Sequence, residues 1–321
     1  MNIPKFWAEA RLQQRQKGKQ ITVRRFGWSR TSQAEAQANA EVRTADAFKR
    51  ILAGESLQRR ELRQAYNGAE GVPIREEVVA EHGEVVITRN GYGALCLNTE
   101  RVLFADVDFD TELGIRTCFS IGFAMMVPAA WIGWRIGSFG VFFLLGILGF
   151  IFVGVIHRIG KWLRGGSENI ARRRIESFLA RHPDWNLRLY RTPAGLRVLA
   201  TQRTFSADDP EVGELFRALG ADPVYVTMCE RQKCFRARVS PKPWRIGINA
   251  HMKPRRGVWP VRPESLPARK AWVDAYHAKA AGFAACRFER ELGNGGVDAS
   301  VRRVIELHDE LCRAASGLPI A

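Results

Sequence analysis

The spacing of hydrophobic residues divides the chain into segments with a helical period and segments with the period of two that strands require. The helical segments, which we predict to be α-helices, are residues 32–52, 167–182, 208–219, 268–292 and 299–315. The predicted strands are residues 20–26, 85–88, 93–97, 101–109, 185–191, 196–201, 224–228 and 234–239. Ser32 and Glu35 have the capping-box spacing, while Pro210 and Gly220 mark the two ends of another helix.

The order of these elements predicts an α+β fold with a largely antiparallel sheet and helices on one side, interrupted by a helical hairpin. Three sequential strands, ending with residues 101–109, are expected to form an antiparallel meander. The predicted regions are an N-terminal strand and helix, two halves of one α+β domain, the hairpin between those halves, and a proline-rich segment with the C-terminal helices. In chain order they cover residues 1–72, 73–116, 117–156, 157–250 and 251–321.

The hairpin is predicted from two long apolar runs, residues 117–134 and 136–156, which are separated only by Arg135. Each is long enough to cross a lipid bilayer, so we predict an inner-membrane protein with two spans. Basic residues flank the outer ends of the hairpin, which places both termini in the cytoplasm. The alternative is a pair of helices buried in a globular core.

The formal net charge of +16 indicates a surface that attracts polyanions, such as a nucleotide, a nucleic acid or anionic headgroups. The six cysteines do not have the spacing of a disulfide framework, so we expect reduced thiols. The N-terminus has no hydrophobic stretch of signal-peptide length.

Candidate chemistry is concentrated at the strand that precedes the hairpin. Asp106 and Asp108 share one face of that strand, about 7 Å apart, and Asp110 and Glu112 continue the pattern. Carboxylates gathered on one face favour a hard divalent cation, so the sequence predicts Mg²⁺ or Mn²⁺ at Asp106 and Asp108. The alternative is a strand end whose charges are simply hydrated.

Several segments, among them residues 87–94, 190–197 and 235–245, resemble those of a widespread group of uncharacterised bacterial membrane proteins. A more distant similarity is to the catalytic core of archaeo-eukaryotic primases and ligase-associated polymerase domains. In that family an Asp-x-Asp strand binds a divalent metal, and a later Gly-Leu-His turn contacts nucleotide phosphate. Asp106 and Asp108 match the first motif, and residues 195–197 match the second with Arg197 in place of histidine. The resemblance implies a third metal-binding aspartate, for which Asp222 is the nearest candidate, and nucleotidyl transfer as a remote possibility.

Arginine can hold phosphate through its fork of donors, so the basic strands supply the predicted ligand site. We expect a phosphorylated or polyanionic ligand to be bound by four arginines: Arg191, Arg197, Arg236 and Arg238. The alternative function is that of a non-enzymatic, membrane-associated scaffold. If these arginines neutralise the carboxylates directly in a closed ion-pair network, the metal hypothesis loses support and the scaffold hypothesis gains it.

Two further motifs are weaker. The spacing of Cys229 and Cys234, with His251 downstream, is compatible with zinc, but four ligands are needed and strand-end thiols are the favoured interpretation. His308 and Asp309 resemble a dipeptide of metal hydrolases. His308 also falls on the apolar stripe of its helix, where a core histidine is the favoured interpretation.

Overall fold

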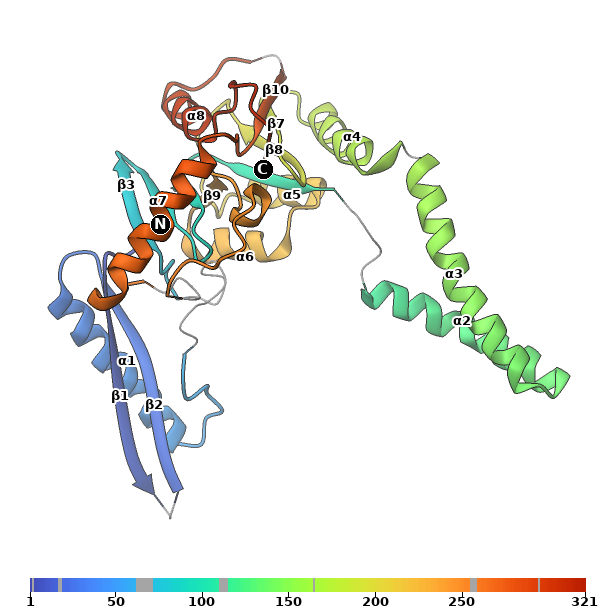
Figure 1. The fold of residues 1–321 in the computed structure, drawn as a ribbon, viewed down its shortest axis with the longest axis horizontal. Helices are drawn as coiled ribbons and strands as arrows, with labels where there is room; N and C mark the ends of the chain where they lie inside the picture. Colours follow the sequence, from blue (N-terminus) through green and yellow to red (C-terminus); the bar gives the residue numbers. More distant parts are fainter. Residues whose placement is uncertain are drawn as a thin grey trace.

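The computed structural model describes residues 1, 3–16, 19–61, 72–109, 115–163, 165–254, 259–293 and 295–321. Figure 1 shows a central body with a long β-hairpin and helix at one end and a two-helix arm at the other. Asp110 and Glu112 of the predicted acidic strand lie outside the described residues.

The N-terminal unit is a two-stranded antiparallel hairpin covered by one helix. It consists of β1 (Phe6–Gln16), β2 (Lys19–Ser29) and α1 (Gln33–Leu52). The predicted helix is confirmed, and Ser32 caps it by accepting a hydrogen bond from the Glu35 amide at 3.1 Å. Strand β1 was not predicted, because its solvent-facing residues include a long polar run that conceals the alternation.

Two four-stranded antiparallel sheets form the central body. One has the order β3-β4-β5-β9 and the other the order β10-β7-β8-β6. The first contains β3 (Glu77–His82), β4 (Val85–Arg89), β5 (Leu95–Thr99) and β9 (Phe235–Arg238). The second contains β6 (Phe104–Asp108), β7 (Leu187–Arg191), β8 (Gly195–Ala200) and β10 (Arg287–Leu292).

The acidic strand β6 does not continue the meander, so that prediction is wrong. It pairs instead with β8, and the free edge of β5 is taken by β9. Both sheets therefore combine strands from before and after the two-helix arm (Figure 1). A single hydrophobic cluster includes side chains from both sheets, for example Leu97 and Val198.

The arm consists of α2 (Ile115–Ile136) and α3 (Phe139–Leu163), which the sequence predicted as helices. A membrane span needs about 20 apolar residues in one helix. Throughout the described ranges, no helix is long and hydrophobic enough to meet that need. The predicted two-span anchor, and with it the inner-membrane localisation and the assignment as an integral membrane protein, is wrong.

The remaining helices pack on the sheets or close the chain. They are α4 (Gly166–Arg181), α5 (Pro210–Leu219), α6 (Pro223–Gln232), α7 (Leu266–Ala280) and α8 (Ala299–Cys312), with 3₁₀ turns at Pro243–Ile246 and Pro263–Ser265. Residues 224–228, predicted as a strand, form α6 because Asp222 caps it and Pro223 occupies its first turn. The predicted helix 268–292 ends at Ala280, and its last part becomes β10.

Candidate functional site

Asp106, a predicted metal ligand, and Arg197, a predicted phosphate ligand, meet at the junction of β6 and β8. Asp106 lies opposite Arg197, whose Nε and Nη2 donate to Asp106 Oδ1 and Oδ2 at 2.7 and 3.0 Å. The Arg197 side chain is 1% exposed, whereas that of Asp106 is 45% exposed. Desolvation opposes ionisation of Asp106, but the Arg197 guanidinium outweighs it and lowers the pKa of the carboxyl group below its ordinary value.

Arg197 also joins this pair to two other elements. Its Nη1 donates to the backbone carbonyl of Arg238 in β9 at 2.8 Å and lies 3.3 Å from His308 Nε2 in α8. All of the guanidinium nitrogens are thus engaged within the protein. A divalent metal at Asp106 would have to share the carboxylate oxygens with Arg197, so this part of the junction is a closed ion pair.

Asp108 has a different environment at the end of β6. Its side chain is exposed and forms no ion pair within the described part of the chain. Partial desolvation and the neighbouring Asp106 raise the pKa of Asp108, and Asp222 adds to the effect. Asp222 uses one oxygen to cap α6 through the Val224 amide at 2.9 Å. The three aspartates are therefore neighbours, and Asp106 and Asp222 both oppose the ionisation of Asp108.

Two of the other predicted arginines are paired with carboxylates. Arg191 donates to Glu168 at 2.8 Å and lies over the ring of Phe109. Arg236 is buried and donates to both oxygens of Glu76, at 2.7 and 2.5 Å. A ligand would have to compete with these carboxylates for Arg191 and Arg236. The role of the two arginines in ligand binding remains a prediction.

Arg238, the fourth predicted arginine, lies beside two further cations, Lys242 and Arg245, that were not predicted as ligand residues. We call Arg238, Lys242 and Arg245 the cation cluster. All three are half-buried, and none of them has an ion-pair partner within 4.0 Å among the described residues. Arg238 Nε and Arg245 Nη1 are buried nitrogens for which the described residues supply no hydrogen-bond acceptor. Desolvation and repulsion from Arg238 lower the pKa of both Lys242 and Arg245.

Two aromatic residues border the cation cluster. Tyr92 and Trp244 meet edge to face, with ring centroids 5.1 Å apart, and Lys242 Nζ lies 5.3 Å from the centre of the Trp244 ring. Trp244 is 51% exposed, so one side of a large aromatic ring faces solvent beside the positive charges. The sequence signal for this cluster is the basic and aromatic run of residues 242–245, which lies within one of the family-like segments.

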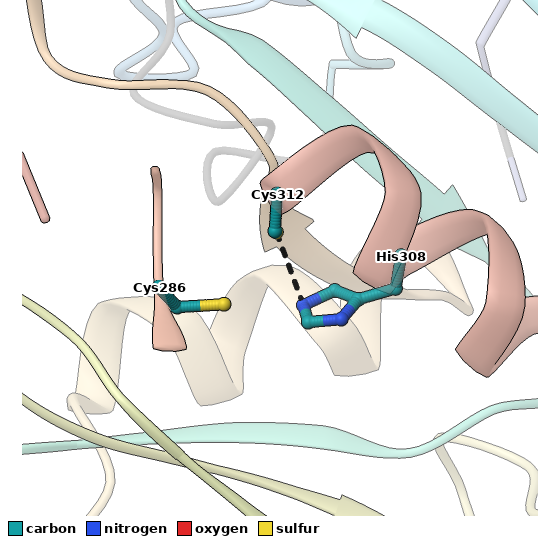
Figure 2. Close-up of side chains that lie close together, drawn as sticks. All are labelled: Cys286, His308 and Cys312. Atoms are coloured by element: carbon teal, nitrogen blue, oxygen red, sulfur yellow. Dashed lines mark hydrogen bonds between the residues drawn. The ribbon is translucent and has the colours of Figure 1, made fainter. Parts of the chain in front are cut away.

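A second group of chemically active side chains lies in the core between α8 and the segment that leads into β10. Figure 2 shows Cys286 pointing toward His308, which is one turn before Cys312 on α8. The ligand atoms of these three residues all lie within 4.8 Å of one another, and all three side chains are fully buried. No other group of three potential metal ligands is this compact in the described ranges, so Cys229, Cys234 and His251 do not form the zinc site considered above.

His308 is a core histidine, as the favoured interpretation predicted, but it also bridges charged and sulfur-containing groups. Its Nδ1 lies 3.0 Å from Asp309 Oδ1, and its Nε2 lies 3.4 Å from Cys312 Sγ. Hydrogen bonding from Cys312 lowers the pKa of the Cys286 thiol, and desolvation raises that of Cys312. Thiolate, imidazole and carboxylate are the parts of a nucleophilic triad, but complete burial keeps a substrate away from the sulfur.

Comparisons with known proteins give no match, whether to a family model, to a curated protein or to a solved structure. The similarity to the primase core therefore remains a prediction. What the chain does has to be inferred from the cation cluster and from the buried sulfur and histidine group.

Proposed function

We propose that this protein binds a nucleoside phosphate at the cation cluster, with phosphate oxygens held by Arg238, Lys242 and Arg245. The observation that carries the proposal is that three half-buried cations converge with no carboxylate oxygen within 4.0 Å among the described residues, although Asp108 attracts Lys242 and Arg245 from farther away. Such an arrangement is unfavourable in the free protein, because like charges repel and buried donors lack acceptors. An anion with several acceptor oxygens removes both costs.

The exposed ring of Trp244 supports a nucleoside rather than a simple phosphate. Aromatic side chains beside a positive groove stack nucleobases, at about 1–3 kcal/mol per base. Tyr92 fixes the tryptophan ring by its edge contact, so the stacking surface is held in place. Phosphate and base would then occupy adjacent parts of one site.

The predicted Mg²⁺ or Mn²⁺ enters this proposal together with the ligand. Magnesium commonly binds through one or two carboxylates and the phosphates of a nucleotide. Asp108 suits that role, since its pKa is raised by partial desolvation and by repulsion from Asp106, and a bound cation would relieve that repulsion. Asp106 can contribute only while it stays paired with Arg197.

Calorimetric titration of the full chain with ATP, ADP, AMP and pyrophosphate, with and without Mg²⁺, tests the proposal. Lys242→Gln and Arg245→Gln should each weaken nucleotide binding about 10- to 100-fold, since a hydrogen bond to a charged group contributes about 1.5–3 kcal/mol. Trp244→Ala should weaken binding of ATP but leave that of pyrophosphate unchanged. Asp108→Asn should reduce only the increase in affinity that Mg²⁺ produces.

Arg217→Gln is the matched control, because it removes an equal charge from an exposed position on α5. Equal weakening by Arg217→Gln would mean that only net charge attracts the ligand, and the site would be rejected. Failure of every phosphate compound to bind would likewise reject it and favour the alternative of a non-enzymatic scaffold.

A further inference from the structure

The buried group of Cys286, His308 and Cys312 has the composition and spacing of a metal site. Thiolates are soft donors that select Cu(I) or Zn(II) over Mg²⁺, and imidazole suits both of these metals. With metal–sulfur and metal–nitrogen bonds of roughly 2.3 and 2.0 Å, neighbouring S and N ligands are roughly 3.5 Å apart in a tetrahedral site and roughly 3.7 Å apart in a trigonal one. The distance from Cys312 Sγ to His308 Nε2 is 3.4 Å, and Cys286 Sγ completes a group within 4.8 Å.

The arrangement around His308 provides independent support. Metal-binding histidines usually donate their second ring N–H to a carboxylate, which fixes the ring and directs the other nitrogen to the metal. Here Asp309 lies 3.0 Å from Nδ1, and Nε2 faces the sulfur atoms. Asp309 is itself held by Arg188 Nη2 at 2.8 Å. The imidazole is further fixed by the ring of Tyr190, whose centroid lies 4.7 Å away.

Charge and coordination number distinguish between the two metals. A structural zinc site needs four ligands, and the described residues place only three potential ligands in this compact group. The Nη1 of Arg197 lies 3.3 Å from His308 Nε2, so a permanent cation borders the site. Cu(I) bound by two thiolates and a neutral imidazole carries a net charge of about −1, and Arg197, although also paired with Asp106, places positive charge beside it.

We propose that Cys286, His308 and Cys312 form a three-coordinate site for Cu(I), buried behind Arg197 and oriented by Asp309. Binding replaces the protons of the two thiols, which pass to solvent, with bonds from both sulfurs to the metal. The oxidation state of the copper does not change. This site is separate from the cation cluster and does not depend on nucleotide binding.

Anaerobic titration of the reduced full chain with Cu(I), in competition with a chromogenic Cu(I) chelator, tests the proposal. The wild-type protein should bind one equivalent, and X-ray absorption of that complex should show two sulfur ligands and one nitrogen ligand. Cys286→Ser, Cys312→Ser and His308→Gln should abolish this binding. Asp309→Asn, which removes only the orienting carboxylate charge, should weaken it about 10- to 100-fold.

Cys229→Ser is the matched control, because Cys229 is also a fully buried thiol but belongs to α6. This variant should bind Cu(I) like the wild type. Copper bound by other donors in the absorption spectrum, or unchanged binding in Cys286→Ser, would overturn the assignment. Tighter binding of Zn(II) than of Cu(I) would overturn the copper assignment. A Cys286–Cys312 disulfide in protein purified without reductant, with no metal binding after reduction, would overturn the site altogether.

Discussion

The ion pair between Arg197 and Asp106 should make a large contribution to the free energy of unfolding. The substitution Arg197→Met removes this ion pair with little change in side-chain volume. The substitution eliminates two charge-assisted bonds to Asp106 and one to the Arg238 carbonyl. Removing one partner of a buried pair typically costs about 3–5 kcal/mol. The Asp106 side chain is 45% exposed and can be rehydrated by water, so we expect the lower end of that range, about 3 kcal/mol.

Urea unfolding of the full chain, followed by circular dichroism, measures this loss. Once Arg197 is replaced, Asp106→Asn should reduce the free energy of unfolding by almost nothing more, because the unpaired carboxylate no longer stabilises the folded protein. Arg191→Met is the control, since its pair with Glu168 is more exposed and should contribute about 0–1 kcal/mol.

The same pair predicts a pH dependence with a definite sign. The folded-state pKa of Asp106 is lowered, so the pair stabilises the protein above the unfolded-state pKa, about 3.9, and is lost as the pH falls through the folded-state value. The difference between wild type and Arg197→Met should therefore be constant near neutral pH and shrink as the pH falls, because the unpaired, desolvated Asp106 of the variant is protonated at a higher pH than the paired Asp106 of the wild type. A loss below about 1 kcal/mol, or strictly additive effects of the Arg197 and Asp106 substitutions, would refute the reasoning.

Three further predictions concern individual positions. Asp108→Asn should raise the melting temperature near pH 7, because the raised pKa of Asp108 means that its ionisation opposes folding. The gain should disappear at acidic pH, where the carboxyl group is protonated in both the folded and the unfolded state. A lower melting temperature of the variant at pH 7 would contradict this prediction. Gly195→Ala should destabilise the β6–β8 pairing by about 1–3 kcal/mol, since the alanine Cβ would lie 2.1 Å from the Val107 carbonyl oxygen. Unchanged hydrogen exchange in both strands would argue against this prediction. Gly27→Ala should separate α1 from β2, because its Cβ would lie 2.1 Å from the Ala40 nitrogen, and exchange in α1 should accelerate while the two four-stranded sheets stay protected.

The sequence by itself determined the elements whose ends are defined by local chemistry. The cap at Ser32 and the proline and glycine that bound α5 act within a few residues of the chain, so their effect does not depend on the rest of the fold. Local signals can also conflict with one another. Residues 224–228 have an apolar, β-branched composition, but the cap at Asp222 and Pro223 made them helical.

Tertiary structure alone decided which strands meet and which charges face one another. The sequence showed that Asp106 and Arg197 were candidates, but the pairing of β6 with β8 made them a closed ion pair. The sequence contains no signal that Cys286 lies close to His308. Cys286 directly precedes β10 and His308 is on α8, more than 20 residues later, so no spacing motif relates the two residues. The reason is physical: periodicity reports the burial of one face of an element, whereas the identity of its partner depends on how distant segments pack together.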